Sequence, residues 1–99
     1  MPRFGFARVH GRSMLPTLRD GDRLLVRYDV APRVGRVLVT RFPDGTVTVK
    51  RATVRDGDGW WVERDNPREG TDSASVGTIP DADVLAVVLG RVWPRPRRL

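Results

Sequence analysis

The sequence contains no cysteine and a single histidine, His10. The absence of cysteine excludes a disulfide framework and a thiolate metal site. A zinc ion would have to rely almost entirely on aspartate and glutamate, a set of ligands that zinc rarely accepts. We therefore expect no metal and no other cofactor.

Long hydrophobic runs are also absent. The longest run, Val84 to Leu89, has six residues, whereas a helix that spans a bilayer needs about 20. The start of the chain carries Arg3 and Arg8 but no apolar segment, so we expect no signal peptide and a cytoplasmic location. The alternative is a membrane-associated protein, because residues 94–99 are rich in arginine and proline and resemble a chain cut just before a membrane helix.

Lysine is nearly absent, although the net charge is +6. Lys50 is the one lysine among 18 basic residues. Arginine keeps its proton in proteins, whereas a buried lysine can lose it. The arginines are spread along the chain, which argues against a nucleic-acid partner, although the Trp60-Trp61 pair keeps base stacking as an alternative.

Turn residues separate short, β-branched segments along the whole chain of 99 residues. This length fits one compact domain. The apolar run near the end fits a helix or a strand, and its valines together with Gly90 favour a strand. The pattern predicts an all-β fold, a small, coiled or partly closed β-sheet. We expect a loop over residues 64–75, a hairpin turn at residues 43–45, and strands over residues 4–10, 23–28, 36–42, 46–54, 60–63, 76–80 and 83–92.

Ser13 lies in a turn that directly follows the first expected strand. Gly11 can tighten this turn, so that the serine oxygen is exposed and nearby backbone N–H groups converge on an oxyanion. An ordinary turn serine would look the same, so Ser13 alone does not define a site. His10 is a poor base for it, because both residues lie on one short segment.

Lys50 lies in the middle of an expected strand, where alternation places Thr48, Ala52 and Val54 on the same face. Burial among small or apolar neighbours would disfavour the ammonium form and lower the pKa of Lys50. An amine that is neutral near pH 7 can take the proton of a serine hydroxyl. A solvated strand lysine is the alternative interpretation.

Three motifs in this order resemble the Ser-Lys peptidases of the S24/S26 superfamily, which include type I signal peptidases and self-cleaving SOS repressors. Residues 9–22 contain Gly-x-Ser-Met-x-Pro-Thr-Leu and Asp-Gly-Asp, and residues 47–51 contain Val-Lys-Arg. Residues 63–80 are similar to the signature G-D-N-x-x-x-S-x-D-S-R followed by G-x-V-P. The Pro-Thr pair and the Asp-Asn pair favour the signal-peptidase branch. The short length is similar to the peptidases that mature nickel-type superoxide dismutase.

The resemblance implies a serine endopeptidase that cleaves a leader from a precursor protein, with a single peptidase domain over residues 1–99 and a basic tail over residues 94–99. The precursor would bind as an extended strand beside residues 4–10, with small residues before the cut. Ser13 would be the nucleophile and Lys50 the general base. Backbone groups would stabilise the oxyanion, namely those of Gly11, Arg12 and Ser13. The supporting residues would be Asp65, Asn66, Thr71, Asp72 and Ser73.

Four positions depart from the family pattern. Gly11 replaces a serine that supplements the oxyanion hole, and Gly70 replaces the serine that steadies the lysine. Ala74 replaces an arginine, which leaves Asp72 without its expected ion-pair partner, and Arg64 replaces a glycine. Three hydroxyls, those of Thr71, Ser73 and Ser75, are the expected substitutes near Lys50. These departures keep a second hypothesis open, a weak or inactive peptidase-fold domain that binds extended peptides.

Overall fold

The computed structural model describes residues 2–99. Its strands form one antiparallel sheet in the order β1-β2-β7-β3-β4-β5-β6, and β8 pairs with β7. This arrangement confirms the predicted all-β class and the single coiled sheet. The strands are β1 (Phe4–Arg8), β2 (Arg23–Arg27), β3 (Val37–Arg41), β4 (Val47–Asp56), β5 (Gly59–Glu63), β6 (Ile79–Pro80), β7 (Val84–Trp93) and β8 (Arg97–Arg98), with the short helices α1 (Ser73–Val76) and η1 (Asp81–Asp83) before β7.

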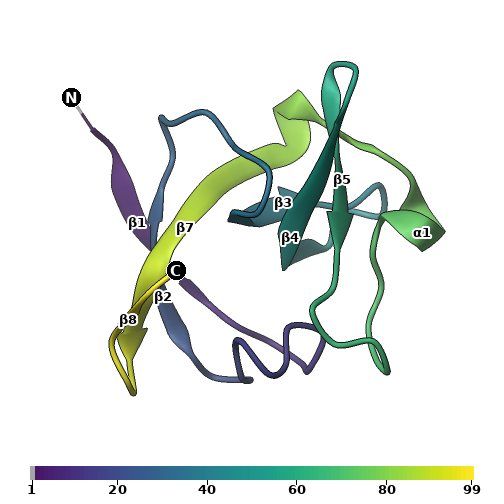
Figure 1. Cartoon of the computed structure of the whole chain (residues 1–99). Helices are drawn as coiled ribbons and strands as arrows, with labels where there is room; N and C mark the ends of the chain where they lie inside the picture. Colours follow the sequence, from purple (N-terminus) through teal and green to yellow (C-terminus); the bar gives the residue numbers. More distant parts are fainter. Residues whose placement is uncertain (1) are drawn as a thin grey trace.

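The sheet curls so that its central strands are buried on both faces. In Figure 1 the long, bent β7 crosses from the part that holds β1 and β2 to the part that holds β3 and β4. The pairing register changes along three pairs of strands, namely β2 with β7, β3 with β7, and β4 with β5. Shifts of this kind bend a strand and increase its twist.

Two apolar clusters form the core, one on each side of the curled sheet. Met14, Leu18 and Val88 belong to the first cluster, and Leu38 and Trp60 belong to the second. Strand β7 contributes to both, because neighbouring residues of a strand point to opposite faces. This burial on both faces explains why its sequence is an unbroken apolar run and not an alternating one.

The region that joins β5 to β7 differs from the expected loop and strand. Residues 76–80 were expected as one strand, but helix α1 occupies Ser73–Val76 and only Ile79–Pro80 is extended. Asp72 is the N-cap of α1, since its side chain accepts a hydrogen bond from the Ala74 N–H. A carboxylate at this position satisfies a backbone donor that the helix itself leaves unpaired.

Both ends of the described chain also differ from expectation. The first strand ends at Arg8 and not at residue 10. The Val9 N–H still donates to the Asp22 carbonyl at 2.9 Å, but the Val9 carbonyl accepts from the Gly21 N–H at 2.8 Å, so the regular pairing with β2 stops there. The expected basic tail is partly ordered against the sheet. Arg97 pairs with Arg91, and the Leu99 N–H donates to the Leu89 carbonyl at 3.0 Å.

The tryptophan pair does not form a stacking surface. Trp60 is buried in the second cluster, with the Arg55 guanidinium 5.2 Å from its ring centre, and Trp61 is only partly exposed.

Within residues 2–99, no helix has the length and the apolar character needed to cross a membrane.

Candidate active site

Ser13 lies on the turn between β1 and β2, and this turn is held at both ends. The Val9 N–H donates to Asp22 on one side, and the Leu18 N–H donates to the Met14 carbonyl at 2.9 Å on the other. Met14 and Leu18 are buried in the first core cluster. Val9 belongs to the same cluster, so buried apolar residues before and after Ser13 fix the turn, while the serine itself stays partly exposed.

The Asp20-Gly21-Asp22 segment braces the same turn. Asp20 accepts a hydrogen bond from the Gly11 N–H at 2.8 Å. Asp22 is buried, accepts from the Arg19 N–H at 2.9 Å, and pairs with Arg91 of β7 at 3.2 Å. Asp20 and Asp22 thus hold the turn around Ser13 in shape, and Asp22 also connects this turn to strand β7.

The side chain of Lys50, on strand β4, extends to Ser13 on the turn between β1 and β2. Its side-chain nitrogen lies 2.9 Å from Ser13 Oγ, 2.8 Å from Thr48 Oγ1 and 3.2 Å from the Val49 carbonyl oxygen. The Phe42 ring centre lies 5.7 Å from the same nitrogen. Lys50 is 2% exposed, so the amine is enclosed by the groups that it contacts.

Burial is the main reason why the pKa of Lys50 falls from 10.5 to about 8. Removal of water disfavours the ammonium form more than the neutral amine. The charge of Asp72 opposes this effect, and the charge of Arg64 adds to it. About one tenth of the amine is then neutral at pH 7.

Asp65 ties the nucleophile turn to the lysine strand. Its two oxygens accept from Arg51 Nε and Nη2 of β4, each at 2.8 Å, and one of them also accepts from Thr17 Oγ1 at 2.6 Å. Burial works to raise the pKa of Asp65, but the hydrogen bonds from Arg51 and Thr17 outweigh it and the pKa is lowered. Asp65 therefore acts as a charged bridge between the turn that holds Ser13 and the strand β4 that holds Lys50.

Asn66 contacts the nucleophile turn directly. Its backbone N–H donates to the Ser13 carbonyl at 2.8 Å, and its side-chain nitrogen donates to the Arg12 carbonyl at 2.9 Å. Asn66 therefore satisfies two consecutive backbone carbonyls of the turn. The Asp-Asn pair predicted to support the site thus contacts both halves of it.

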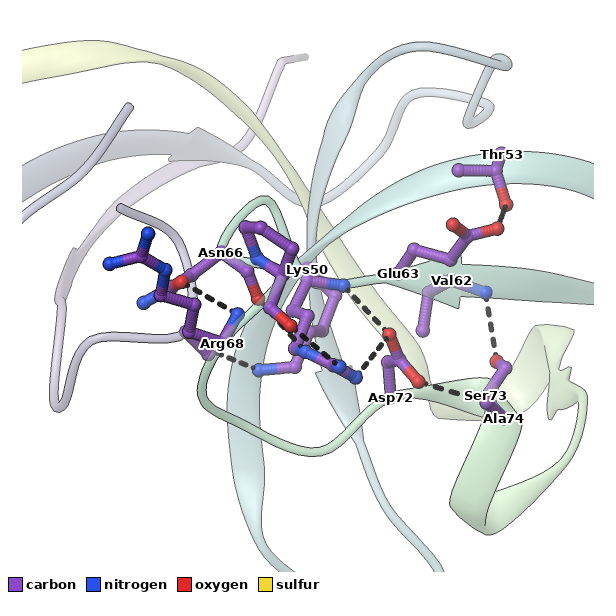
Figure 2. A network of polar contacts seen from close by, with 12 residues as sticks. Lys50, Thr53, Val62, Glu63, Asn66, Arg68, Asp72, Ser73 and Ala74 are labelled. Atoms are coloured by element: carbon purple, nitrogen blue, oxygen red, sulfur yellow. Dashed lines mark hydrogen bonds and ion pairs between the residues drawn. The ribbon is translucent and has the colours of Figure 1, made fainter. Parts of the chain in front are cut away.

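Asp72 does have an ion-pair partner, contrary to the expectation from Ala74. Arg64 donates to Asp72 Oδ2 from Nη1 and from its backbone nitrogen, both at 3.2 Å. Ala74 contributes its backbone N–H at 3.1 Å, as can be followed in Figure 2. The guanidinium that the signature places at position 74 therefore comes from position 64, because the loop folds back over eight residues.

The threonine hydroxyl that contacts Lys50 Nζ belongs to Thr48. The three expected substitutes have other positions. Ser73 is buried and its hydroxyl accepts from the Val62 N–H at 2.8 Å (Figure 2). Thr71 lines the open groove beside the serine, and Ser75 is exposed. Thr48 was recognisable as a neighbour in the sequence, since residues two apart on a strand share a face.

Gly70 lies directly against Ser13. A Cβ atom at this position would come 2.4 Å from Ser13 Cβ, and the backbone φ is +116°. Both facts exclude an ordinary side chain here. The steadying serine of the family has no room at this position.

The backbone donors near Ser13 are not equivalent. The Gly11 N–H is already donated to Asp20, so the expected role of Gly11 in binding an oxyanion is not open to it in this arrangement. The N–H groups of Arg12 and Ser13 form no hydrogen bond with residues 2–99. These two donors are free to bind an oxyanion beside the serine hydroxyl.

A groove of about 390 Å³ opens over the Ser13–Lys50 pair. A smaller hollow of about 60 Å³ lies under Ser13, with Met14, Val39 and Val49 in its wall. His10 borders both, yet the hydrogen bond of Ser13 Oγ is with Lys50. The residues around the larger opening are His10, Gly11, Arg12, Ser13, Phe42, Asp44, Thr46, Thr48, Lys50, Glu69, Gly70, Thr71 and Val76.

A hydroxyl beside a buried amine, on a curled antiparallel sheet, is an arrangement suited to hydrolysis through a serine nucleophile. Comparison with known families agrees, since the Peptidase S24-like family matches residues 2–89. The chain belongs to this peptidase family.

Relatives of known description point in the same direction. The chain is similar to mitochondrial inner membrane protease subunit 1 of Schizosaccharomyces pombe, at 30% identity over 94% of this chain and 76% of that protein. The corresponding subunit of Xenopus tropicalis is 29% identical over 85% of this chain and 66% of its own length. The LexA repressor of Frankia alni is 34% identical over 93% of this chain, which spans only 32% of the repressor.

Proposed function

We propose that this chain is a serine endopeptidase with a Ser13–Lys50 dyad that removes a leader segment from a precursor protein. The single observation that supports it most is the distance of 2.9 Å between Lys50 Nζ and Ser13 Oγ. This lies within the reach that proton transfer requires. The lowered pKa of Lys50 supplies a neutral amine near physiological pH.

The reaction proceeds by acyl transfer. Neutral Lys50 accepts the Ser13 proton while Ser13 Oγ attacks the peptide carbonyl carbon. The N–H groups of Arg12 and Ser13 stabilise the oxyanion. As the C–N bond breaks, the Lys50 ammonium gives its proton to the leaving amine. Lys50 then takes a proton from water while the water oxygen attacks the ester carbon. As the ester C–O bond breaks, the Lys50 ammonium returns this proton to Ser13 Oγ, so the serine hydroxyl and the neutral amine are restored.

The shape of the site favours an extended substrate with a small side chain before the cut. Strand β1 lies at one end of the sheet and has β2 as its neighbour, so its other edge offers backbone groups to an added strand. The hollow of about 60 Å³ under Ser13 is walled by Met14 and by Val39 and Val49. A residue of the size of alanine fits this hollow.

The location of this processing is part of the same proposal, and we place it in the cytoplasm. Fractionation of cells that produce the protein, followed by detection in the soluble and the membrane fractions, tests this assignment. Recovery in the membrane fraction would overturn it.

The test of the function compares the wild type with Ser13→Ala, Lys50→Arg and Lys50→Met. The substrates are extended peptides with alanine before the cut, and a serine-directed acylating probe is used in parallel. Arginine keeps the charge but cannot act as a base, so all three variants should lose at least a hundredfold in activity. Full activity of Lys50→Arg would sink the mechanism. Peptide binding without acylation of Ser13 would favour the alternative, a non-catalytic peptide-binding domain.

A further inference from the structure

Asp72 is a buried carboxylate that needs a cation. It is 5% exposed, and a buried charge without partners costs several kcal/mol. Three donors meet it, namely the guanidinium of Arg64, the Arg64 backbone N–H and the Ala74 N–H. Arg64 is the only one of them that brings a full positive charge.

The Arg64 guanidinium also holds the loop between β5 and α1. Its Nε donates to the Asn66 carbonyl at 2.9 Å, and its Nη2 lies 3.4 Å from the Pro67 carbonyl. One side chain therefore connects Asp72, at the end of this loop, to the start of the loop. The polar network around Asp72 and Asn66 is drawn in Figure 2.

This loop is in contact with the nucleophile turn at two places. Asn66 donates to the carbonyls of Arg12 and Ser13. Gly70 lies so close that an added Cβ would meet Ser13 Cβ at 2.4 Å and Arg64 Cδ at 3.3 Å. Ser13 and the stem of Arg64 thus both pack against the side of Gly70 where a side chain would stand.

We propose that Arg64 is a positioning residue, which clamps Asp72 and the loop of residues 65–72 behind Ser13 and neutralises Asp72 beside Lys50. Arg64 directly follows β5, and it supplies the guanidinium that the family signature has at position 74. This inference rests on the proposed function, because it assigns Arg64 a part in the Ser13–Lys50 reaction.

The charge of Arg64 has a predictable effect on the lysine. Asp72 favours the Lys50 ammonium and Arg64 disfavours it. Loss of Arg64 leaves Asp72 unopposed, so the amine would hold its proton to higher pH. The other charged or titratable groups that face the groove are His10, Arg12, Asp44 and Glu69.

The single lysine makes a direct test of this effect practicable. A chain labelled with ¹³C at the lysine ε-carbon gives one lysine signal, since Lys50 is the only lysine. Its chemical shift is followed against pH without substrate, and kcat and KM are measured separately on a cleaved peptide. If the wild type cleaved no peptide, the proposed function would fail while the titration would still test Arg64.

Three variants are compared with the wild type. Arg64→Gln removes the cation. Arg68→Gln is the matched control, because Arg68 lies on the same loop and, within residues 2–99, its one hydrogen bond is made by its backbone N–H, to Asn66. Arg64→Gln combined with Ala74→Arg moves the cation to the exposed neighbour on the other side of Asp72.

We expect Arg64→Gln to move the lysine midpoint to higher pH and to lower kcat at pH 7 about threefold to tenfold, with KM little changed. Arg68→Gln should stay within twofold of the wild type. The relocated cation should restore the midpoint and most of kcat. A merely structural loss would not move the midpoint.

Two results would overturn the proposal. One is an Arg64→Gln protein that has the midpoint and kcat of the wild type. The other is a relocated cation that restores neither. If Arg64→Gln does not fold, the relocation variant decides. Recovery of the folded NMR spectrum supports the ion pair, and failure to recover it contradicts the proposal.

Discussion

Lys50 Nζ lies 2.8 Å from Thr48 Oγ1, a hydroxyl two residues earlier on the same strand. A neutral amine has two N–H donors and one lone pair. If the donors go to Thr48 and to the Val49 carbonyl, at 2.8 and 3.2 Å, the lone pair faces Ser13 Oγ. Thr48 therefore orients the amine for proton transfer from the serine.

Replacing Thr48 by valine should impair this orientation without changing the volume of the side chain. We expect kcat to fall about tenfold to a hundredfold, less than the roughly 10²–10⁴-fold that general-base catalysis contributes as a whole, because Lys50 itself remains. Thr48→Ser keeps the hydroxyl and should keep most of the activity. Thr53→Val is the control on the same strand, because Thr53 contacts Trp61 and Glu63 and not the lysine. Equal activity of Thr48→Val and the wild type would contradict this role.

The reactivity of Ser13 should rise with pH through the pKa of Lys50. With that pKa at about 8, the neutral fraction grows from about one tenth at pH 7 to about nine tenths at pH 9. The rate of acylation by a serine-directed probe should therefore rise roughly tenfold over this interval and then level off. A rate that is flat or falls between pH 7 and pH 9 would exclude neutral Lys50 as the base.

Lys50 should also make folding stability depend on pH. Its pKa is 10.5 ordinarily and about 8 in the folded chain, so the unfolded chain binds more protons between these values. Stability then rises with pH across this window, and the cost of the buried lysine is fully present below pH 8. Lys50→Met removes the cost, so its Tm relative to the wild type should be higher at pH 7 than at pH 10.5. An equal Tm difference at both pH values would refute this linkage.

A side chain at position 70 should damage the site more than one at position 77. Both glycines have positive φ, +116° and +83°, but only the Cβ at position 70 meets Ser13. Gly77 has φ +83° and ψ −172°, a combination that almost only glycine adopts, so Gly77→Ala should lose about 1–3 kcal/mol for the backbone alone. Gly70→Ala should lose a further 1–3 kcal/mol or so from overpacking, and its acylation rate should fall at least tenfold. Urea unfolding and probe acylation measure the two effects, and equal losses in the two variants would disprove the contact.

The Asp65 bridge should contribute more stability than an exposed ion pair of the same kind. Asp65→Asn weakens the contact with Arg51 and Thr17 at a partly buried site, and about 1–3 kcal/mol should be lost. Asp81→Asn is the matched control, because its pair with Arg55 is exposed on both sides and water screens such a pair, so it should contribute little to stability. Urea unfolding at pH 7 compares the two, and a smaller loss for Asp65→Asn would count against the bridge.

The strands were predictable where local signals were strong. The Asp44-Gly45 turn between two β-branched segments predicted the β3–β4 hairpin, and its register pairs Leu38 with Lys50. Helix α1 was missed because four residues show no periodicity, although Asp72 could have been read as an N-cap. Strand β8 was missed because it depends on pairing with β7, which its own Arg-rich sequence does not reveal.

The site was predictable only in part from the residues themselves. Ser13 and Lys50 are 37 residues apart, and no local pattern brings them together, so the ordered motifs of the family had to supply that hypothesis. The Thr48 contact followed from strand alternation. The Arg64–Asp72 pair did not, because it depends on the path of the loop between them.

The buried position of the one lysine also determines how the protein reacts with reagents and enzymes that modify lysine amines. Apart from Lys50, every basic side chain other than His10 is a guanidinium. Crosslinking esters, acetyl donors and ubiquitin ligases that require a lysine amine therefore find a single target, at 2% exposure. Resistance to such reagents, until unfolding opens the site, makes lysine acylation a direct readout of the native state.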